Sequence, residues 1–233
     1  MRKSSPSSLR IYFMNLAIFD LDNTLLNGDS DYNWGIYLVK RGFLDEKKYK
    51  AQNQKFFEEY QAGKLDIFAF AEFQFQFLKN NKRKFLNDVL SDYVDEIIKP
   101  IILEKAVSLV KQHRDAGDRL LIITATNSFI TKPIGKLFGI EELIGTDPEE
   151  HLGEFTGKVK GIPSYKEGKV SRLYDWLNEQ NMKLTDFKKT FFYSDSHNDL
   201  ALLEEVTNPV VVNGDEILLN KAQEKNWPTL NLK

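Results

Sequence analysis

The chain has 233 residues, of which 42% are hydrophobic, enough for one substantial core and a smaller appended module. Its formal charge of −2 excludes a chain-wide electrostatic attraction to nucleic acid or to an anionic membrane. It contains no cysteine, which excludes disulfides, thiolate metal sites and a cysteine nucleophile. Because no apolar run approaches the roughly 20 residues that span a bilayer, we expect a cytoplasmic protein with no membrane or nucleic-acid partner.

Residues 1–15 differ in texture from the rest of the chain. They begin with Arg2 and Lys3 and contain a Ser- and Pro-rich cluster, but they lack the apolar segment and the cleavage site of a signal peptide. We expect an N-terminal tail here. Since the patterned sequence begins at Leu16, Met14 is a candidate for the true start of the protein.

Four short apolar runs each end abruptly at polar residues. They are 16–19, 120–123, 190–193 and 209–212, followed by Asp20, Thr124, Ser194-Asp195 and Asn213-Gly214. Runs of this length and composition predict strands that are buried on both faces of a parallel sheet. Ligands of such sheets bind at the carboxyl ends of the strands, so the polar residues are expected to converge.

Helical patterns lie between these runs. Apolar residues recur at helical spacing in two segments, Leu103, Ala106, Val107 and Val110, and Val170, Leu173, Tyr174 and Leu177. Strands that alternate with helices predict a doubly wound α/β fold with a parallel sheet.

The segment from Gly28 to about Asp95 contains no strand-like apolar run and is rich in aromatic residues. We predict a helical insertion over 28–95, and a core made of 16–27 and 96–233. Phe68, Ala71 and Phe75 share one helical face, although the alternating aromatic residues at 70–77 also permit a strand. Residues 154–161, with Gly157 near their centre, predict a short hairpin.

Two carboxylates, Asp20 and Asp22, follow the first predicted strand two residues apart. Burying like charges together is costly unless a cation or a bound proton compensates. An isolated pair of this kind more often caps a helix, but two more carboxylates, Asp195 and Asp199, follow the third predicted strand. Oxygen ligands without thiolates select Mg²⁺.

Thr124 and Lys169 complete a set that suits phosphoryl transfer. The set contains a carboxylate nucleophile, an acid/base, ligands for a divalent cation, and donors for phosphate oxygens. In chain order, Asp-x-Asp-x-Thr, a strand-end Thr, a Lys and Asp-x-x-x-Asp resemble the four motifs of the haloacid dehalogenase superfamily, from Leu16 onward. The insertion resembles its helical cap, and the subgroup it most resembles contains phosphoserine phosphatases and histidinol-phosphatase-like proteins.

The resemblance implies a role for each motif residue. Asp20 would be the nucleophile and a Mg²⁺ ligand, and Asp22 the general acid/base, with its backbone carbonyl on the metal. Asp195 and Asp199 would hold Mg²⁺, the latter directly or through water. The phosphate-binding residues would be Thr124, Ala125, Lys169 and Asn198.

The second motif departs from the phosphoserine phosphatase pattern, in which two glycines follow the hydroxyl residue. Here the run is Thr124-Ala125-Thr126-Asn127, while Asp29 falls where those enzymes have an acidic residue that contacts the substrate amine. The resemblance therefore implies a small phosphomonoester of an amino acid or amino alcohol, such as phosphoserine or histidinol phosphate, and a monomer or homodimer. Asp29 and Asp31 are also candidates for a helix cap.

Other residues and functions remain as alternatives. Lys166 competes with Lys169 as the motif lysine, and His197 lies within the acidic cluster, whereas we expect His113 and His151 at the surface. The alternative functions are a phosphotransferase or mutase on the same core, and a non-enzymatic receiver-like domain that is phosphorylated on Asp.

Overall fold

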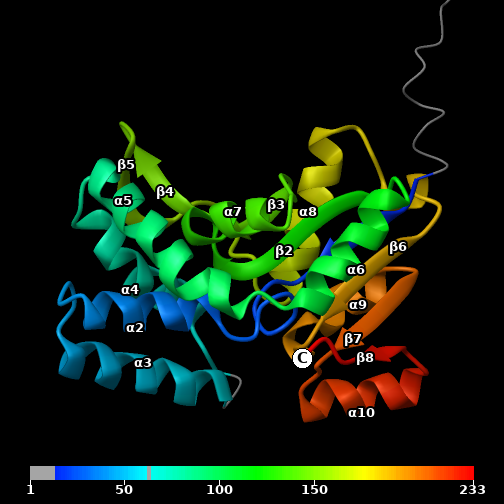
Figure 1. Ribbon diagram of the computed structural model, residues 1–233, viewed down its shortest axis with the longest axis horizontal. Helices are drawn as coiled ribbons and strands as arrows, with labels where there is room; N and C mark the ends of the chain where they lie inside the picture. Colours follow the sequence, from blue (N-terminus) through cyan, green and yellow to red (C-terminus); the bar gives the residue numbers. More distant parts are fainter. Residues whose placement is uncertain (1–13, 62–63) are drawn as a thin grey trace, which may run out of the picture.

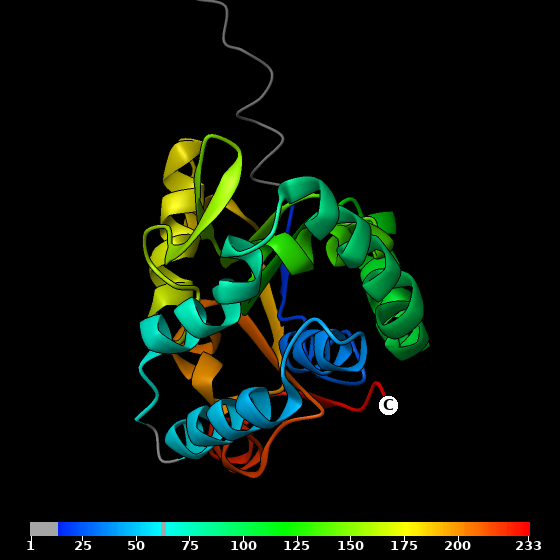
Figure 2. The same cartoon turned by 90° about the vertical axis from the view of Figure 1, so that its left-hand side faces the viewer.

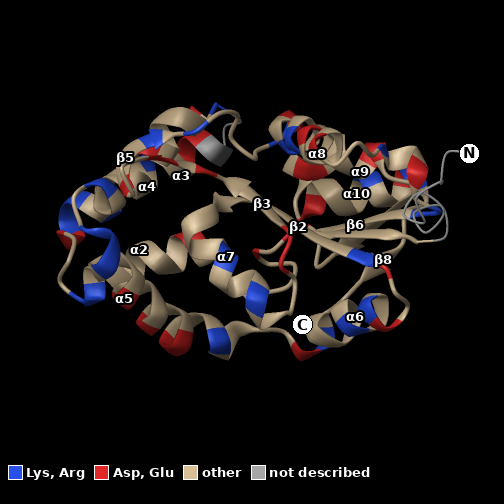
Figure 3. Ribbon diagram, turned by 90° about the horizontal axis from the view of Figure 1, so that it is seen from above, with Lys and Arg blue, Asp and Glu red and all other residues tan. Residues whose placement is uncertain are grey.

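The computed structural model describes residues 14–61 and 64–233. The predicted N-terminal tail therefore lies almost entirely outside the described residues. In the part of the chain that is described, no helix combines the length and the apolar character needed to cross a membrane. Acidic and basic residues are interspersed along the helices of the molecule (Figure 3).

A six-stranded parallel sheet forms the centre of the molecule (Figure 1), with strand order β3-β2-β1-β6-β7-β8. Its strands are β1 (Leu16–Phe19), β2 (Arg119–Asn127), β3 (Leu143–Thr146), β6 (Thr190–Ser194), β7 (Asn208–Val212) and β8 (Thr229–Leu230). The four predicted strands are all present, as β1, β2, β6 and β7. The short strands β3 and β8 were not predicted.

Helices cover both faces of this sheet, because alternate residues of each strand point to opposite sides. Ala17 and Phe19 face the layer that includes α6 (Glu104–Asp115) and α7 (Ser128–Leu137). Leu16 and Ile18 face the opposite layer. That layer contains α8 (Glu167–Glu179), α9 (Leu200–Glu205) and α10 (Glu216–Lys225). The result is a three-layer α/β/α core, as predicted.

Helices fill the predicted insertion, which faces the viewer in Figure 2. They are α2 (Ser30–Lys40), α3 (Glu46–Gln61), α4 (Ile67–Lys79) and α5 (Arg83–Tyr93), followed by a π-helical turn at Val94–Ile98 and a 3₁₀ turn at Lys99–Ile101. Aromatic side chains form much of their interior, with the Trp34 ring 5.0 Å from that of Tyr93. The alternative of a strand at 70–77 is wrong, and Phe68, placed on the predicted inner face, is 51% exposed. The division into cap and core at 28 and 95 stays a prediction.

A two-stranded antiparallel hairpin contacts the insertion. It pairs β4 (Pro148–His151) with β5 (Glu154–Val159), and its turn uses Leu152 and Gly153 at φ of 50° and 82°. The hairpin is present, but the prediction of residues 154–161 placed it too far along the chain. Those residues include the second strand, and the turn lies before them. The guanidinium of Arg83, at the start of α5, lies 3.6 Å from the centre of the Phe155 ring and joins the hairpin to the insertion.

Three further local predictions are wrong. Strand β2 does not end at Thr124 but continues to Asn127. Val107 and Tyr174, which were predicted on buried helical faces, are exposed because each lies at the edge of its apolar stripe. His113 is mostly buried, since Asp118 and the Tyr193 hydroxyl hydrogen-bond its two ring nitrogens at 2.7 and 2.8 Å. His151 is exposed in the hairpin, as predicted.

Burial of the helical stripe on α8 can be tested by one substitution. Leu173 is 0% exposed beneath the sheet, so Leu173→Ala should lower the free energy of unfolding by about 2–5 kcal/mol. The same change at Leu219, which is 43% exposed on α10, should cost less than about 1 kcal/mol. Urea unfolding measures both, and equal losses would contradict the assigned packing.

Candidate active site

Three strand ends meet at one edge of the sheet. Strand β1 lies between β2 and β6. Asp20 and Asp195 directly follow β1 and β6, and Thr124 lies three residues before the end of β2, so these residues come together where the strand order reverses. A cavity of about 360 Å³ opens here. Its described lining includes six aspartates, Asp20, Asp22, Asp29, Asp31, Asp195 and Asp199, and a single basic residue, Lys169.

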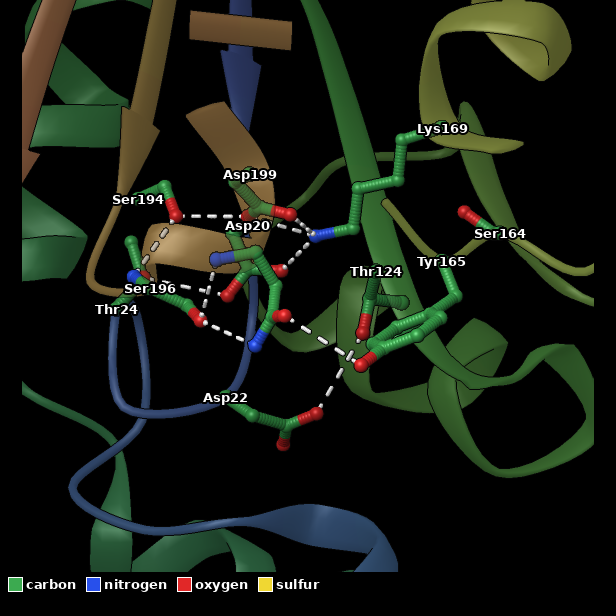
Figure 4. A network of polar contacts seen from close by, with 12 residues as sticks. Asp20, Asp22, Thr24, Thr124, Ser164, Tyr165, Lys169, Ser194, Ser196 and Asp199 are labelled. Atoms are coloured by element: carbon green, nitrogen blue, oxygen red, sulfur yellow. Dashed lines mark hydrogen bonds and ion pairs between the residues drawn. The ribbon is translucent and has the colours of Figure 1, made fainter. Parts of the chain in front are cut away.

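Lys169 joins two of these carboxylates (Figure 4). It lies in the first turn of α8, almost fully buried, with its Nζ 2.8 Å from Asp20 Oδ1 and 2.7 Å from Asp199 Oδ1. The Ser194 hydroxyl donates to Asp199 Oδ2 at 2.7 Å. Ion pairing with both carboxylates raises the pKa of Lys169, although burial alone would lower it, so its positive charge is retained.

Asp20 and Asp195 lie side by side. The Thr24 hydroxyl lies 3.3 Å from Asp20 Oδ2 and 3.1 Å from Asp195 Oδ1, and thus connects the two carboxylates. Burial raises the pKa of Asp20 to about 7, against the opposing effect of Lys169. Burial, together with repulsion from Asp20 and Asp199, raises the pKa of Asp195 to about 8. The positive charge near Asp20 and Asp195 therefore does not balance the negative charge of the two carboxylates.

Asp22 points across the cavity toward the end of β2. Its Oδ1 accepts the backbone N–H of Ser30 at 2.6 Å, and its Oδ2 accepts the Thr126 hydroxyl at 2.8 Å. Removal from bulk water, aided by repulsion from Asp29, raises the pKa of Asp22 to about 6. A carboxyl group with a pKa near neutrality can both donate and accept a proton during a reaction cycle.

The donor set fits a Mg²⁺ ion. The carboxylates of Asp20 and Asp195 and the backbone carbonyl of Asp22 are hard oxygen ligands, whereas Asp199 is paired with Lys169. Among the described residues, no three Asp, Glu, His or Cys side chains form a complete ligand set by themselves. Mg²⁺ commonly keeps several waters and needs only one or two carboxylates, so this incomplete set is compatible with it.

The remaining predicted residues also border the cavity. Ala125 and Asn198 line it, and the Tyr165 hydroxyl lies 3.4 Å from Asn198 Oδ1. Asp29 lines it as well and caps α2, accepting the backbone N–H groups of Asp31 and Tyr32 at 2.9 Å. Asp31 is therefore not the cap. The structure brings together every residue that the sequence assigned to the site, while their roles stay predictions.

Two competing residues lie elsewhere. His197 pairs through Nδ1 with Asp215 at 2.8 Å and is not among the described residues that line the cavity. The Lys166 ammonium lies over the Tyr165 ring, 5.3 Å from its centre, so Lys169 is the lysine that contacts Asp20.

The comparisons with known proteins agree with this geometry. Residues 17–204 match the family model of haloacid dehalogenase-like hydrolases. The chain is 48% identical over 220 residues to a histidinol-phosphatase of Neisseria meningitidis serogroup C, covering 94% of this chain and 99% of that protein. The chain belongs to the haloacid dehalogenase-like hydrolase family.

Solved structures show the same fold. A Bordetella pertussis protein of unknown function is 39% identical, with a TM-score of 0.91 over 95% of this chain and 100% of its own. A substrate-bound phosphoserine phosphatase is only 17% identical but has a TM-score of 0.66, over 93% of this chain and 92% of its own. The predicted family, fold class and enzyme class, a phosphoric monoester hydrolase, are confirmed, and the receiver-like alternative is wrong.

Several polar residues of this hydrolase site were missed from the sequence. Thr126 donates to Asp22 and Ser194 to Asp199, while Thr24, noted from the sequence only as the Thr of the first motif, lies between Asp20 and Asp195. A hydroxyl next to a motif carboxylate was the available signal, but a strand-end Ser or Thr is too common to be decisive without the fold.

The crowding of carboxylates predicts a pH-dependent stability in EDTA. The folded pKa values of Asp20 and Asp195, about 7 and 8, exceed their ordinary value of 3.8, so the folded protein binds more protons between these limits. Stability should therefore fall as the pH rises from 5 to 8.5. Thermal unfolding should show this fall, and Mg²⁺ should raise the melting temperature more at pH 8.5 than at pH 5.

Asp195→Asn removes one of the repelling charges and should flatten this pH dependence. Asp45→Asn, at an exposed helix start outside the site, serves as the control and should retain it. An unchanged slope in Asp195→Asn would show that the carboxylate pair does not cause the effect.

Proposed function

We propose that the protein is a Mg²⁺-dependent phosphatase that hydrolyses histidinol phosphate through a phosphorylated Asp20. The observation that carries this proposal is the position of the Asp20 carboxylate. It borders the cavity, one oxygen is paired with Lys169, and the carboxyl of Asp22 lies two residues on in the same cavity. The 48% identity to a histidinol-phosphatase over nearly the full length of both proteins supports the choice of substrate.

In the first step, one oxygen of Asp20 attacks phosphorus and the bond between phosphorus and the ester oxygen breaks. Asp22 gives its proton to the departing alkoxide, which leaves as the free alcohol. Lys169 offsets the negative charge of Asp20 as the phosphate approaches, while the Thr124 hydroxyl and nearby backbone N–H groups can donate to phosphate oxygens. Mg²⁺, when bound by Asp20 and Asp195, supplies further positive charge that lowers the repulsion between carboxylate and phosphate.

In the second step, water attacks the phosphorus of phosphorylated Asp20. Asp22, now ionised, accepts a proton from that water, and the bond between phosphorus and Asp20 breaks to release inorganic phosphate and restore both carboxyl groups. Ser30 and Thr126 hold Asp22 by hydrogen bonds in the orientation that both steps require. A pKa of about 6 suits this exchange of roles near neutral pH.

The charge of the cavity favours an amino alcohol over an amino acid. Asp29 and Asp31 can attract an ammonium group, whereas Lys169, the one basic residue among the described lining residues, is already paired with Asp20 and Asp199. The carboxylate of phosphoserine would meet negative charge without a cationic partner. Histidinol phosphate has the amine but no carboxylate.

Removing the nucleophile tests the chemistry. Asp20→Asn should abolish phosphate release, and Asp22→Asn should slow it about 10²–10⁴-fold because proton transfer is lost. Asp45→Asn is the control. Phosphate release measured with and without Mg²⁺ tests the metal requirement. Product analysis in the presence of an acceptor alcohol separates hydrolysis from phosphoryl transfer. Full activity of Asp20→Asn would refute the proposed intermediate.

The substrate assignment has a separate test. The wild-type kcat/KM for histidinol phosphate should exceed that for phosphoserine by about tenfold or more, since burying an unpaired carboxylate costs at least 1.4 kcal/mol. Equal values for the two substrates would contradict the electrostatic reasoning while leaving the phosphatase chemistry intact.

A further inference from the structure

We propose that Asp31 and Gln74 together bind the imidazole ring of the substrate. The inference rests on the proposed function and assigns a recognition role to two residues outside the catalytic motifs. Asp31 belongs to the first turn of α2 and Gln74 to the middle of α4, and both line the cavity that contains Asp20. Recognition and phosphoryl transfer would thus occupy two parts of one cavity.

The two side chains form a buried polar pair. Gln74 Nε2 donates to Asp31 Oδ2 at 2.7 Å, and the Tyr49 hydroxyl lies 3.5 Å from Gln74 Oε1. Asp31 and Gln74 are each 8% exposed, and Tyr49 is 6% exposed. This chain of polar groups connects α2, α3 and α4 inside an insertion whose interior is otherwise largely aromatic.

Burying a carboxylate in this position is costly for the folded protein. Its pKa is raised well above the ordinary value, first by burial and then by repulsion from Asp29 and Asp22. No Lys or Arg among the described residues that line the cavity is paired with it. A leucine or methionine would pack in such an interior without this cost. A substrate that brings an N–H donor or a positive charge removes the penalty.

An imidazole ring matches what surrounds Asp31. The ring is flat and partly apolar, and the same cavity wall contains the aromatic side chains of Phe56, Phe70 and Phe75. A ring N–H can donate to Asp31, and the Gln74 amide fixes the orientation of that carboxylate. The volume of about 360 Å³ falls in the range of small-ligand sites.

Asp29 and Asp31 then bind different nitrogen atoms of the substrate. Asp29 is exposed and lies one residue before α2, so we assign it the ammonium group that every amino alcohol phosphate shares. Asp31 is the buried member, so it contacts the part that distinguishes histidinol phosphate from other amino alcohol phosphates.

The test compares two substrates that differ only in the ring. Phenylalaninol phosphate has the phosphate, the amine and a ring, but its phenyl group has no N–H. In the wild type, the ratio of kcat/KM for histidinol phosphate to that for phenylalaninol phosphate should be about 10 to 100, as expected for one hydrogen bond to a charged group. Asp31→Asn, which keeps the size and the Gln74 contact, should lower this ratio at least about tenfold.

Three variants make the result specific. Gln74→Met removes the amide at similar volume and should also lower the ratio, and it provides a second measurement if Asp31→Asn is unstable. Asp66→Asn changes the exposed cap of α4 outside the cavity and should keep the wild-type ratio. Asp29→Asn should lower kcat/KM for both substrates by a similar factor, because both contain the amine.

The outcomes separate the inference from the proposed function. A high wild-type ratio that survives both Asp31→Asn and Gln74→Met overturns the inference and leaves histidinol phosphate as the substrate. A wild-type ratio near one overturns the inference as well. If the wild type releases phosphate from p-nitrophenyl phosphate but from neither amino alcohol phosphate, the proposed function fails and the inference fails with it.

Discussion

The ion pairs of Lys169 with Asp20 and Asp199 are the interaction on which the site depends. Six aspartates line the cavity, and this lysine is the one basic residue among the described residues that line it. Lys169 offsets part of the negative charge around Asp20 and Asp199, but its ion pairs do not include Asp195. Negative charge therefore exceeds positive charge in the cavity, which suits a site that binds a metal ion before it receives a phosphate.

The topology of the sheet makes this concentration of charge possible. Asp20 and Asp195 are separated by most of the chain, yet β1 pairs directly with β6 over its full length. Insertion of α2 to α5 directly after β1 leaves the pairing of the sheet unchanged, because the chain returns through α6 to β2 beside the same strand. The core thus positions the carboxylates at the strand ends, while the insertion provides one wall of the cavity.

The sequence was sufficient to predict the parts that are determined by local pattern. Buried strands ending in Asp20 or Asp195 have a distinctive signal, and so has the order of the four motifs. Strand β3 was missed because its four residues include Gly145 and Thr146, which weaken the apolar pattern. His113 was wrongly placed at the surface, since its partner Tyr193 is 80 residues away and only the fold brings the two together, although its other partner, Asp118, is nearby in the sequence. The Asp31 and Gln74 pair is likewise a long-range contact.

The end of β2 links catalysis to recognition. The two glycines of the phosphoserine phosphatase pattern that the sequence resembles would fall at Ala125 and Thr126, and Asn127 follows them. Thr126 donates to Asp22, the proposed acid/base, and the Asn127 side chain caps α7 and also hydrogen-bonds Asp31. Strand β3 approaches the backbone of this segment closely at Gly145, where a Cβ would lie only 2.7 Å from the Thr126 carbonyl oxygen. Thr126 and Asn127 thus contact residues at the two ends of the proposed substrate, Asp22 and Asp31, which is why we connect this segment with substrate choice and not with loss of activity.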